Sequence, residues 1–136
     1  MKPLALLLLL ACASKQTPAV PRQDEAIRLV LDTYGAPEME SRIRVQWLAC
    51  EGGTFETGWS VGRRPYAIKA GWLMLCEGRR PSETNLAHVI AHKLCEERRL
   101  GADPHFYRDH DHTIAWLWGA GGLVEKANRR LEEAGL

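Results

Sequence analysis

Histidine is concentrated in one short stretch of this 136-residue chain. All five histidines lie within 25 consecutive residues, namely His88, His92, His105, His110 and His112. A neutral imidazole is the commonest metal ligand among protein side chains, and its ordinary pKa of about 6.5 also suits acid–base catalysis. The clustering therefore indicates a metal site or a catalytic site. The alternative is that these histidines are solvated or partnered polar residues of a helix that serves packing.

Two of the histidines have the spacing of paired ligands on a helix. His88, His92 and Glu96 follow one another at intervals of four, so they line one helix face. That face lies about 160° from the apolar row expected to face the core. The apolar row is Leu86, Ile90 and Leu94. Side chains four apart can converge on one cation, as paired zinc ligands often do.

A third ligand must come from another segment, and residues 109–112 can supply it by folding back after a loop. Two ligand sets follow. One is His92, Glu96 and His112, because a carboxylate is an accepted zinc ligand. The other is His88 and His92 with either His110 or His112. The sequence leaves both sets open, and it predicts zinc as the metal if one is bound.

The elements that must position these residues predict an α+β domain. Residues 24–34 place apolar side chains at the spacing of an amphipathic helix. Residues 42–48 alternate, so Ile43, Val45 and Trp47 share one face of a strand.

Short apolar runs at 59–61, 66–68 and 72–75 are separated by glycine and proline. They predict a small antiparallel sheet between the first helix and the histidine-bearing helix.

The pattern becomes helical again after the strands. Ser82 is a plausible N-cap for the long helix, which we expect to run to about Leu100. A short helical stretch covers 113–118. The last helix carries four apolar residues on one face, namely Leu123, Val124, Ala127 and Leu131.

The N-terminus has the pattern of a secretory signal. Lys2 is followed by an apolar run that is too short to span a bilayer. Leu9–Leu10–Ala11–Cys12 resembles the lipobox of bacterial lipoproteins, which implies cleavage before Cys12 and lipidation of that cysteine. An ordinary signal peptide that happens to carry a cysteine is the alternative. The expected organisation is a signal peptide at 1–11, a lipidated tether at 12–23 and one domain at 24–136.

Export sets the expected partners and the redox context. The mature chain loses Lys2 and no acid, so its 17 basic residues balance its 17 acidic ones and nothing favours a nucleic acid. The expected partners are a lipid membrane and an unidentified envelope protein or peptide. Ala13 implies, by the lipoprotein sorting rule, an outer-membrane destination. Disulfides persist outside the cytoplasm, and Cys50 with Cys76 is the favoured pair because both end strand-like runs; pairings with Cys95 stay open.

The histidine region resembles zincin-type metallopeptidase domains of small bacterial lipoproteins. The resemblance rests on residues 86–96, on 101–103 and on 111–113 with Trp116 beyond, and it covers roughly residues 84–131. In that family the helix reads His-Glu-x-x-His, and a downstream histidine after an aspartate completes a three-ligand zinc site.

The departures from this family fall at the catalytic positions. If His92 is the first ligand, Lys93 stands where the catalytic glutamate belongs and Glu96 replaces the second histidine. An ammonium group has no lone pair with which to accept a proton from water. If His88 is the first ligand, Val89 occupies the base position instead.

Both registers therefore lack the general base. The resemblance implies a zincin-like lipoprotein with a degenerate site that serves binding or assembly. The alternatives are an active envelope metallopeptidase that uses Glu96, Glu97 or an acid from another segment, and a structural lipoprotein without metal.

Overall fold

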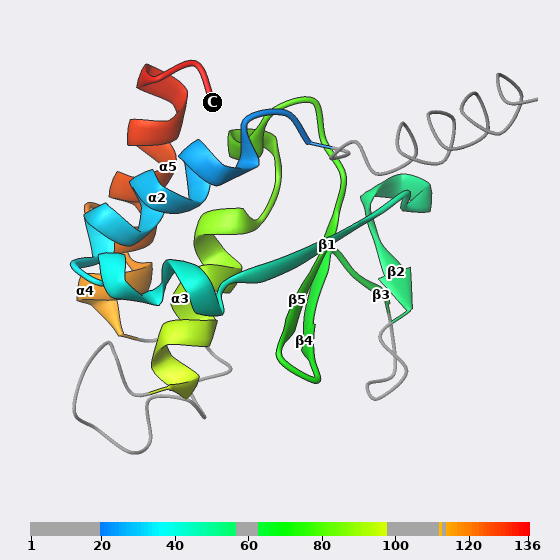
Figure 1. Ribbon diagram of the computed structural model, residues 1–136, viewed down its shortest axis with the longest axis horizontal. Helices are drawn as coiled ribbons and strands as arrows, with labels where there is room; N and C mark the ends of the chain where they lie inside the picture. Colours follow the sequence, from blue (N-terminus) through cyan, green and yellow to red (C-terminus); the bar gives the residue numbers. More distant parts are fainter. Residues whose placement is uncertain (1–19, 57–62, 98–111, 113) are drawn as a thin grey trace, which may run out of the picture.

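The described part of the chain contains four α-helices and two small sheets (Figure 1). The structure is a computed structural model, and it describes residues 20–56, 63–97, 112 and 114–136. The helices are α2 (Gln23–Tyr34), α3 (Leu86–Glu96), α4 (Ala115–Trp118) and α5 (Leu123–Glu133). The strands are β1 (Arg44–Leu48), β2 (Phe55–Glu56), β3 (Arg63–Arg64), β4 (Tyr66–Lys69) and β5 (Trp72–Cys76). Short 3-10 turns span Pro37–Arg42, Glu51–Gly53 and Pro81–Glu83. The α+β class predicted from the sequence is confirmed.

The larger sheet is mixed, which corrects the antiparallel sheet predicted from the sequence. Its strand order is β1-β5-β4, with β4 and β5 antiparallel but β1 and β5 parallel. β4 and β5 form a hairpin whose two turn residues, Ala70 and Gly71, both have positive φ, as a tight two-residue turn requires. β1 instead reaches β5 through a long connection that includes β2, β3 and β4, so it can enter in the same direction. Apolar alternation fixes the faces of a strand but not its direction.

The predicted faces of β1 are confirmed. Val45 and Trp47 pack against the hydrophobic core, whereas Arg44 and Gln46 are exposed. The Arg44 guanidinium lies 4.8 Å from the centroid of the Trp72 ring on the neighbouring strand. This cation–π contact covers part of an otherwise exposed tryptophan at the edge of the sheet.

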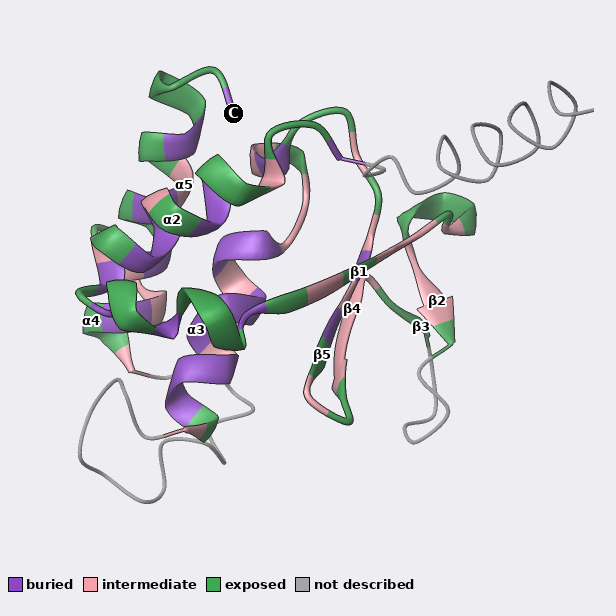
Figure 2. Ribbon diagram, in the orientation of Figure 1, coloured by how far each residue is buried: buried purple, intermediate pink, exposed green. Residues whose placement is uncertain are grey.

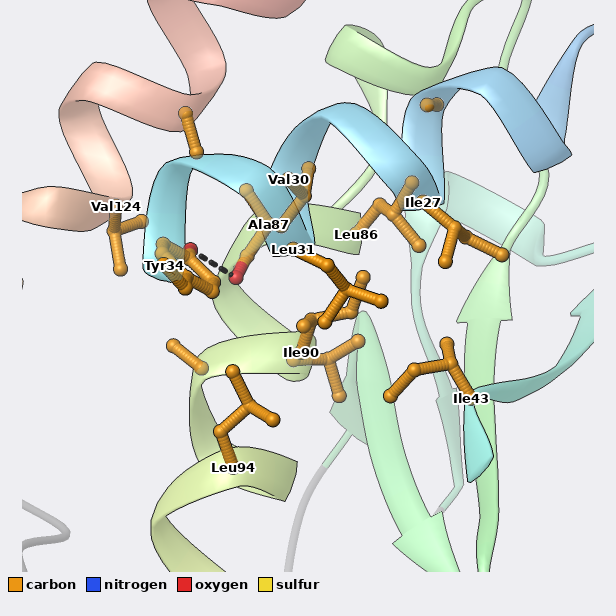
Figure 3. Close-up of a cluster of buried hydrophobic side chains, with 14 of the residues drawn as sticks. Ile27, Val30, Leu31, Tyr34, Ile43, Leu86, Ala87, Ile90, Leu94 and Val124 are labelled. Atoms are coloured by element: carbon orange, nitrogen blue, oxygen red, sulfur yellow. Dashed lines mark hydrogen bonds between the residues drawn. The ribbon is translucent and has the colours of Figure 1, made fainter. Parts of the chain in front are cut away.

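Helix α3 lies between the other helices and the larger sheet. It contacts α2 and α5, and it also contacts β4 and β5 (Figure 1). Its predicted apolar row is fully buried, and most of the helix is coloured as buried in Figure 2. The hydroxyl of Tyr34 on α2 donates a 2.6 Å hydrogen bond to the carbonyl of Ala87 (Figure 3). The next residue is His88, the first histidine of the cluster, so this hydrogen bond holds α3 in place immediately before His88.

Helix α3 begins later than the sequence predicts. Ser82 lies inside a 3-10 turn, and its backbone N–H donates to the carbonyl of Leu136 at the chain's last residue. The hydroxyl of Thr84 accepts a hydrogen bond from the backbone N–H of Leu86, the first residue of the helix. Ser82 is therefore not the N-cap, because its segment is bonded to the end of α5 and the chain must turn again before α3 starts.

One disulfide joins the ends of the two parallel strands. Cys50 and Cys76 are bonded, as the sequence favoured, and Cys95 is buried and is not part of this disulfide. Leu48 is level with Cys76 in the β1–β5 register, so the bridge closes the sheet immediately beyond its last strand pair. The two cysteines are 26 residues apart, and the bridge therefore closes a loop that contains β2, β3 and β4.

The predicted lipidation site, Cys12, lies outside the described residues. Within the described ranges, no helix has both the length and the apolar character needed to cross a bilayer.

We expect reduction of the Cys50–Cys76 disulfide to lower the free energy of unfolding by about 3 kcal/mol, because the bridge restricts a loop of this length in the unfolded chain. Urea denaturation of the protein with and without reductant measures the change. A Cys50→Ser/Cys76→Ser double variant is the control, since reductant should leave its midpoint unchanged. Equal midpoints for the oxidised and reduced native sequence would contradict this expectation.

Candidate metal centre

Three histidines from two segments converge in the described structure. They are His88 and His92 on α3 and His112 just before α4, and one potential ligand atom from each lies within 4.8 Å of the others. The Nε2 atom of His92 lies 3.1 Å from Nε2 of His88 and 3.0 Å from Nε2 of His112. All three side chains are half-buried. The three histidines are therefore close enough to bind one metal ion.

The distances suit a metal better than they suit hydrogen bonds. An imidazole nitrogen has a single in-plane position, which holds either a proton or a lone pair. Nε2 of His92 has two histidine neighbours, and Nε2 of His88 has both His92 and the Tyr66 hydroxyl, 3.1 Å away. The single proton or lone pair on each Nε2 cannot make good hydrogen bonds to two partners at once. A cation at the shared point uses one lone pair from each ring, and tetrahedral zinc at about 2.05 Å from nitrogen places its ligand atoms about 3.3 Å apart.

The helix supplies two of the three rings by its periodicity alone. His88 and His92 are one turn apart on α3, opposite the buried apolar row, so burial of that row turns both rings away from the core. Their ring centroids are 4.8 Å apart.

His112 reaches the pair from the other segment with an uncommon backbone conformation. Its φ is +57°, in the left-handed region that few residues other than glycine adopt and in which histidine is one of the enriched exceptions. Such a conformation persists where surrounding contacts hold it, and it is frequent at functional sites. Here the His112 ring packs against His92, with ring centroids 5.0 Å apart.

Trp118 packs against all three imidazoles. Its ring centroid lies 4.8 Å from that of His88 and 4.6 Å from those of His92 and His112. Trp118 is the last residue of α4, and the chain turns at once through Gly119 toward α5. A Cβ atom on Gly119 would lie 2.7 Å from the carbonyl oxygen of Ala115, so only glycine fits this turn. The turn therefore holds the indole in place against the histidines.

The electrostatics keep His88 in the form that binds a metal. Burial, with a smaller contribution from His112, lowers the pKa of His88 to about 4. The imidazole is therefore neutral near pH 7, as a metal ligand must be. Burial also raises the pKa of the Tyr66 phenol, against an opposing effect of the nearby Arg64 guanidinium, so Tyr66 stays a hydrogen-bond donor near neutral pH.

The predicted ligands divide into three groups. His88, His92 and His112 come together, an arrangement compatible with the all-imidazole set. Glu96 is exposed and does not belong to this group of ligand atoms. His110 lies outside the described residues.

Lys93 lies next to the cluster in sequence but has a different role in the structure. It is a buried charged residue, and its Nζ lies 3.0 Å from Oε1 of Glu97. Glu97 also bonds Arg42, with Nη1 to Oε2 at 3.0 Å. Desolvation alone would raise the pKa of Glu97, but the hydrogen bonds from Lys93 and Arg42 bring it below its usual range. Lys93 and Glu97 therefore form an ion pair on a helix face about 100° or more from the histidines.

Sequence reasoning did not identify Tyr66 or Trp118 as neighbours of the cluster. In the sequence, only the position of Trp118 immediately before Gly119 distinguishes it from the other tryptophans. Tyr66 gives no local signal, because its place beside α3 depends on the pairing of β4 with β5.

Comparisons with protein-family models, with curated protein sequences and with solved structures give no significant match.

We expect the free energy of unfolding of the metal-free protein to fall as the pH is lowered from about 6.5 toward 4. Folding lowers the pKa of His88, so the unfolded chain binds a proton in this range that the folded chain does not, and protonation favours unfolding. Urea denaturation in the presence of a chelator at several pH values measures the dependence. A His88→Gln variant should show a shallower dependence, and an identical slope in both proteins would contradict the expectation.

Proposed function

We propose that this chain is an envelope lipoprotein whose domain holds one zinc ion through His88, His92 and His112 and serves binding or assembly. The convergence of three imidazole nitrogens is the observation that carries the proposal. Three neutral nitrogen ligands with room for a fourth are a common zinc coordination set. Lipidation at Cys12 and an outer-membrane destination are part of the same proposal and rest on the N-terminal sequence alone.

Zinc at this point would link two distant parts of the chain. His92 and His112 are 20 residues apart, and their Nε2 atoms are 3.0 Å apart. When bound, the ion would supply a strong cross-link between α3 and the segment before α4, together with an electrophilic fourth position. The chain's own contribution is to hold the three rings, with Trp118 packed against them.

The described residues around the three histidines support binding more than catalysis. No carboxylate of the described ranges belongs to the ligand group, and Tyr66 is a donor near neutral pH. With His88 and His92 as the helix pair, the position of the zincin glutamate is held by Val89, which is fully buried. A hydrolase that activates water needs a proton acceptor beside the metal, and an aliphatic side chain cannot act as one.

The tether sets how far the domain can be from the lipid. Val20 is fully buried although it lies in the stretch that the sequence assigned to the tether, and seven residues, 13–19, separate it from the predicted lipidated Cys12, a distance of eight residue steps. Eight extended residues reach at most about 28 Å. A zinc-binding domain so anchored would stay near the membrane surface.

We expect the purified protein to bind one zinc ion per chain. Zinc binding should weaken by about a hundredfold or more in each of three variants, His88→Ala, His92→Ala and His112→Ala. The reason is that even changes to residues around a metal site's ligands lower metal affinity by about 10- to 100-fold. Metal analysis and competition with a chromophoric chelator measure stoichiometry and affinity.

Glu96→Gln is the matched control for the zinc titration. It removes a potential ligand from the same helix, yet the residue is exposed and outside the group, so we expect affinity to change by less than about twofold. Loss of zinc in Glu96→Gln with retention in His88→Ala would favour the alternative ligand set. Absence of stoichiometric zinc in the native sequence would overturn the proposal.

We expect Lys93→Glu to destabilise the fold by about 1–3 kcal/mol without producing peptide hydrolysis. The change breaks the pair with Glu97 and places two carboxylates one helix turn apart, on a face away from the histidines. Denaturation and a casein-cleavage assay with added zinc measure both effects. Lys93→Met, which keeps the apolar stem, should lose less stability. Chelator-sensitive hydrolysis in Lys93→Glu would contradict the placement of this residue.

A further inference from the structure

We propose that the open position of this metal centre binds an oxyanion, a carboxylate or phosphate oxygen, held by the Tyr66 hydroxyl and the Arg64 guanidinium. The inference rests on the proposed zinc site and adds the chemical class of its ligand. Two geometric observations carry it, the contact of Tyr66 with His88 and the convergence of the histidines, and the positive charge of Arg64 near Tyr66 supports it.

The Tyr66 hydroxyl is the first part of the oxyanion site. Its oxygen lies 3.1 Å from Nε2 of His88, so it is adjacent to the point where the three imidazoles converge. Once the His88 lone pair is directed to a metal, that nitrogen can no longer accept the Tyr66 proton. The O–H then needs another acceptor at the same place. An oxygen atom of a ligand in the fourth position is such an acceptor.

Arg64 is the second part of the site. Its positive charge lies near the Tyr66 phenol, whose pKa it lowers against the larger, opposite effect of burial. A guanidinium has only N–H donors, so Arg64 can offer hydrogen bonds and positive charge to an anion beside Tyr66. Arg64 is itself exposed and has further N–H groups, which match the two oxygens of a carboxylate or phosphate.

The chain between the two residues explains why they lie together. Pro65 separates them and restricts Arg64 to an extended conformation, and β3 ends at Arg64 while β4 begins at Tyr66. The chain bends at Pro65, where it passes from the two-stranded sheet to the three-stranded one. The β4–β5 hairpin then places Tyr66 beside α3.

The charges at the site also favour an anion. A divalent ion held by three neutral imidazoles keeps its full charge of +2, and Arg64 adds another positive charge. Among the described residues, no carboxylate is a member of the ligand group. A carboxylate or phosphate oxygen would offset this charge at close range, and an uncharged ligand would not.

Anion titration of the cobalt-substituted protein tests the inference without relying on activity. The visible absorption of bound Co²⁺ reports a change in its ligands, and we expect saturable shifts on addition of acetate and of inorganic phosphate at constant ionic strength. The two titrations distinguish carboxylate from phosphate by their relative affinities. We expect Tyr66→Phe and Arg64→Ala each to weaken the tighter anion by about three- to tenfold, the range for one hydrogen bond.

Arg63→Ala is the matched control. It removes the same charge from the neighbouring position of β3, but its guanidinium bonds Thr54, with Nε to Oγ1 at 3.1 Å and Nη2 to the carbonyl at 3.0 Å. We expect anion affinity in Arg63→Ala to change by less than about twofold. All three variants should still take up one Co²⁺ per chain.

The outcomes separate this inference from the proposed function. One Co²⁺ per chain with no spectral response to either anion would overturn the oxyanion site and leave the metal site standing. Equal weakening in Arg63→Ala and Arg64→Ala would also overturn it, because the effect would then be general charge. Failure to take up any metal would overturn both.

Discussion

The arrangement of the site depends on one constraint: three imidazole nitrogens from two segments must meet at one point. Two of them are brought together by a single turn of α3, which needs no tertiary structure. The third comes from 20 residues further along the chain and must be placed by the packing of α4 and α5. Metal binding would add an attractive interaction at this point, whereas neutral rings alone leave one nitrogen position with two partners. The position of His112 is therefore the part of the site that a metal would stabilise most.

The fold meets this constraint by giving α3 two functional faces. One face is the buried row that joins α2 and α5 to the sheet, and it fixes the rotation of the helix. The other face carries His88 and His92, half-buried between β4 and α4. The Tyr34 hydroxyl bond to Ala87 links the two faces, since it restrains the helix one residue before His88 (Figure 3). A shift of α3 along its axis would break this bond and move both rings.

Local patterns in the sequence predicted the parts of this arrangement that depend on one element. The α+β class, the buried rows of α3 and α5 and the faces of β1 all follow from spacing alone, and the structure has the Cys50–Cys76 disulfide that the sequence favoured. Lipidation at Cys12 and the signal peptide stay predictions, because residues 1–19 lie outside the described ranges.

The parts that the sequence did not predict depend on contacts between elements. The parallel pairing of β1 with β5 is set by the connection between them, and the start of α3 is set by the bond of Ser82 to Leu136. The grouping of His88 and His92 with His112, without Glu96, required the position of the segment before α4. Tyr66 was missed for the same reason, since the strand that carries it lies beside α3 only through its pairing with β5.

The surroundings of the three histidines bear on what a bound ion would do. Trp118 packs against all three rings, and an aromatic side chain there excludes water without accepting a proton. Val89, which lies between the two helix histidines in sequence, is a buried aliphatic side chain, and Lys93 pairs with Glu97. Two polar groups described near the ligands, the phenol of Tyr66 and the guanidinium of Arg64, are both donors. Donors beside a cation stabilise an anion that is bound, whereas generating an attacking hydroxide requires an acceptor. These surroundings are the basis for our proposal of a site that holds a negatively charged group rather than one that cleaves a bond.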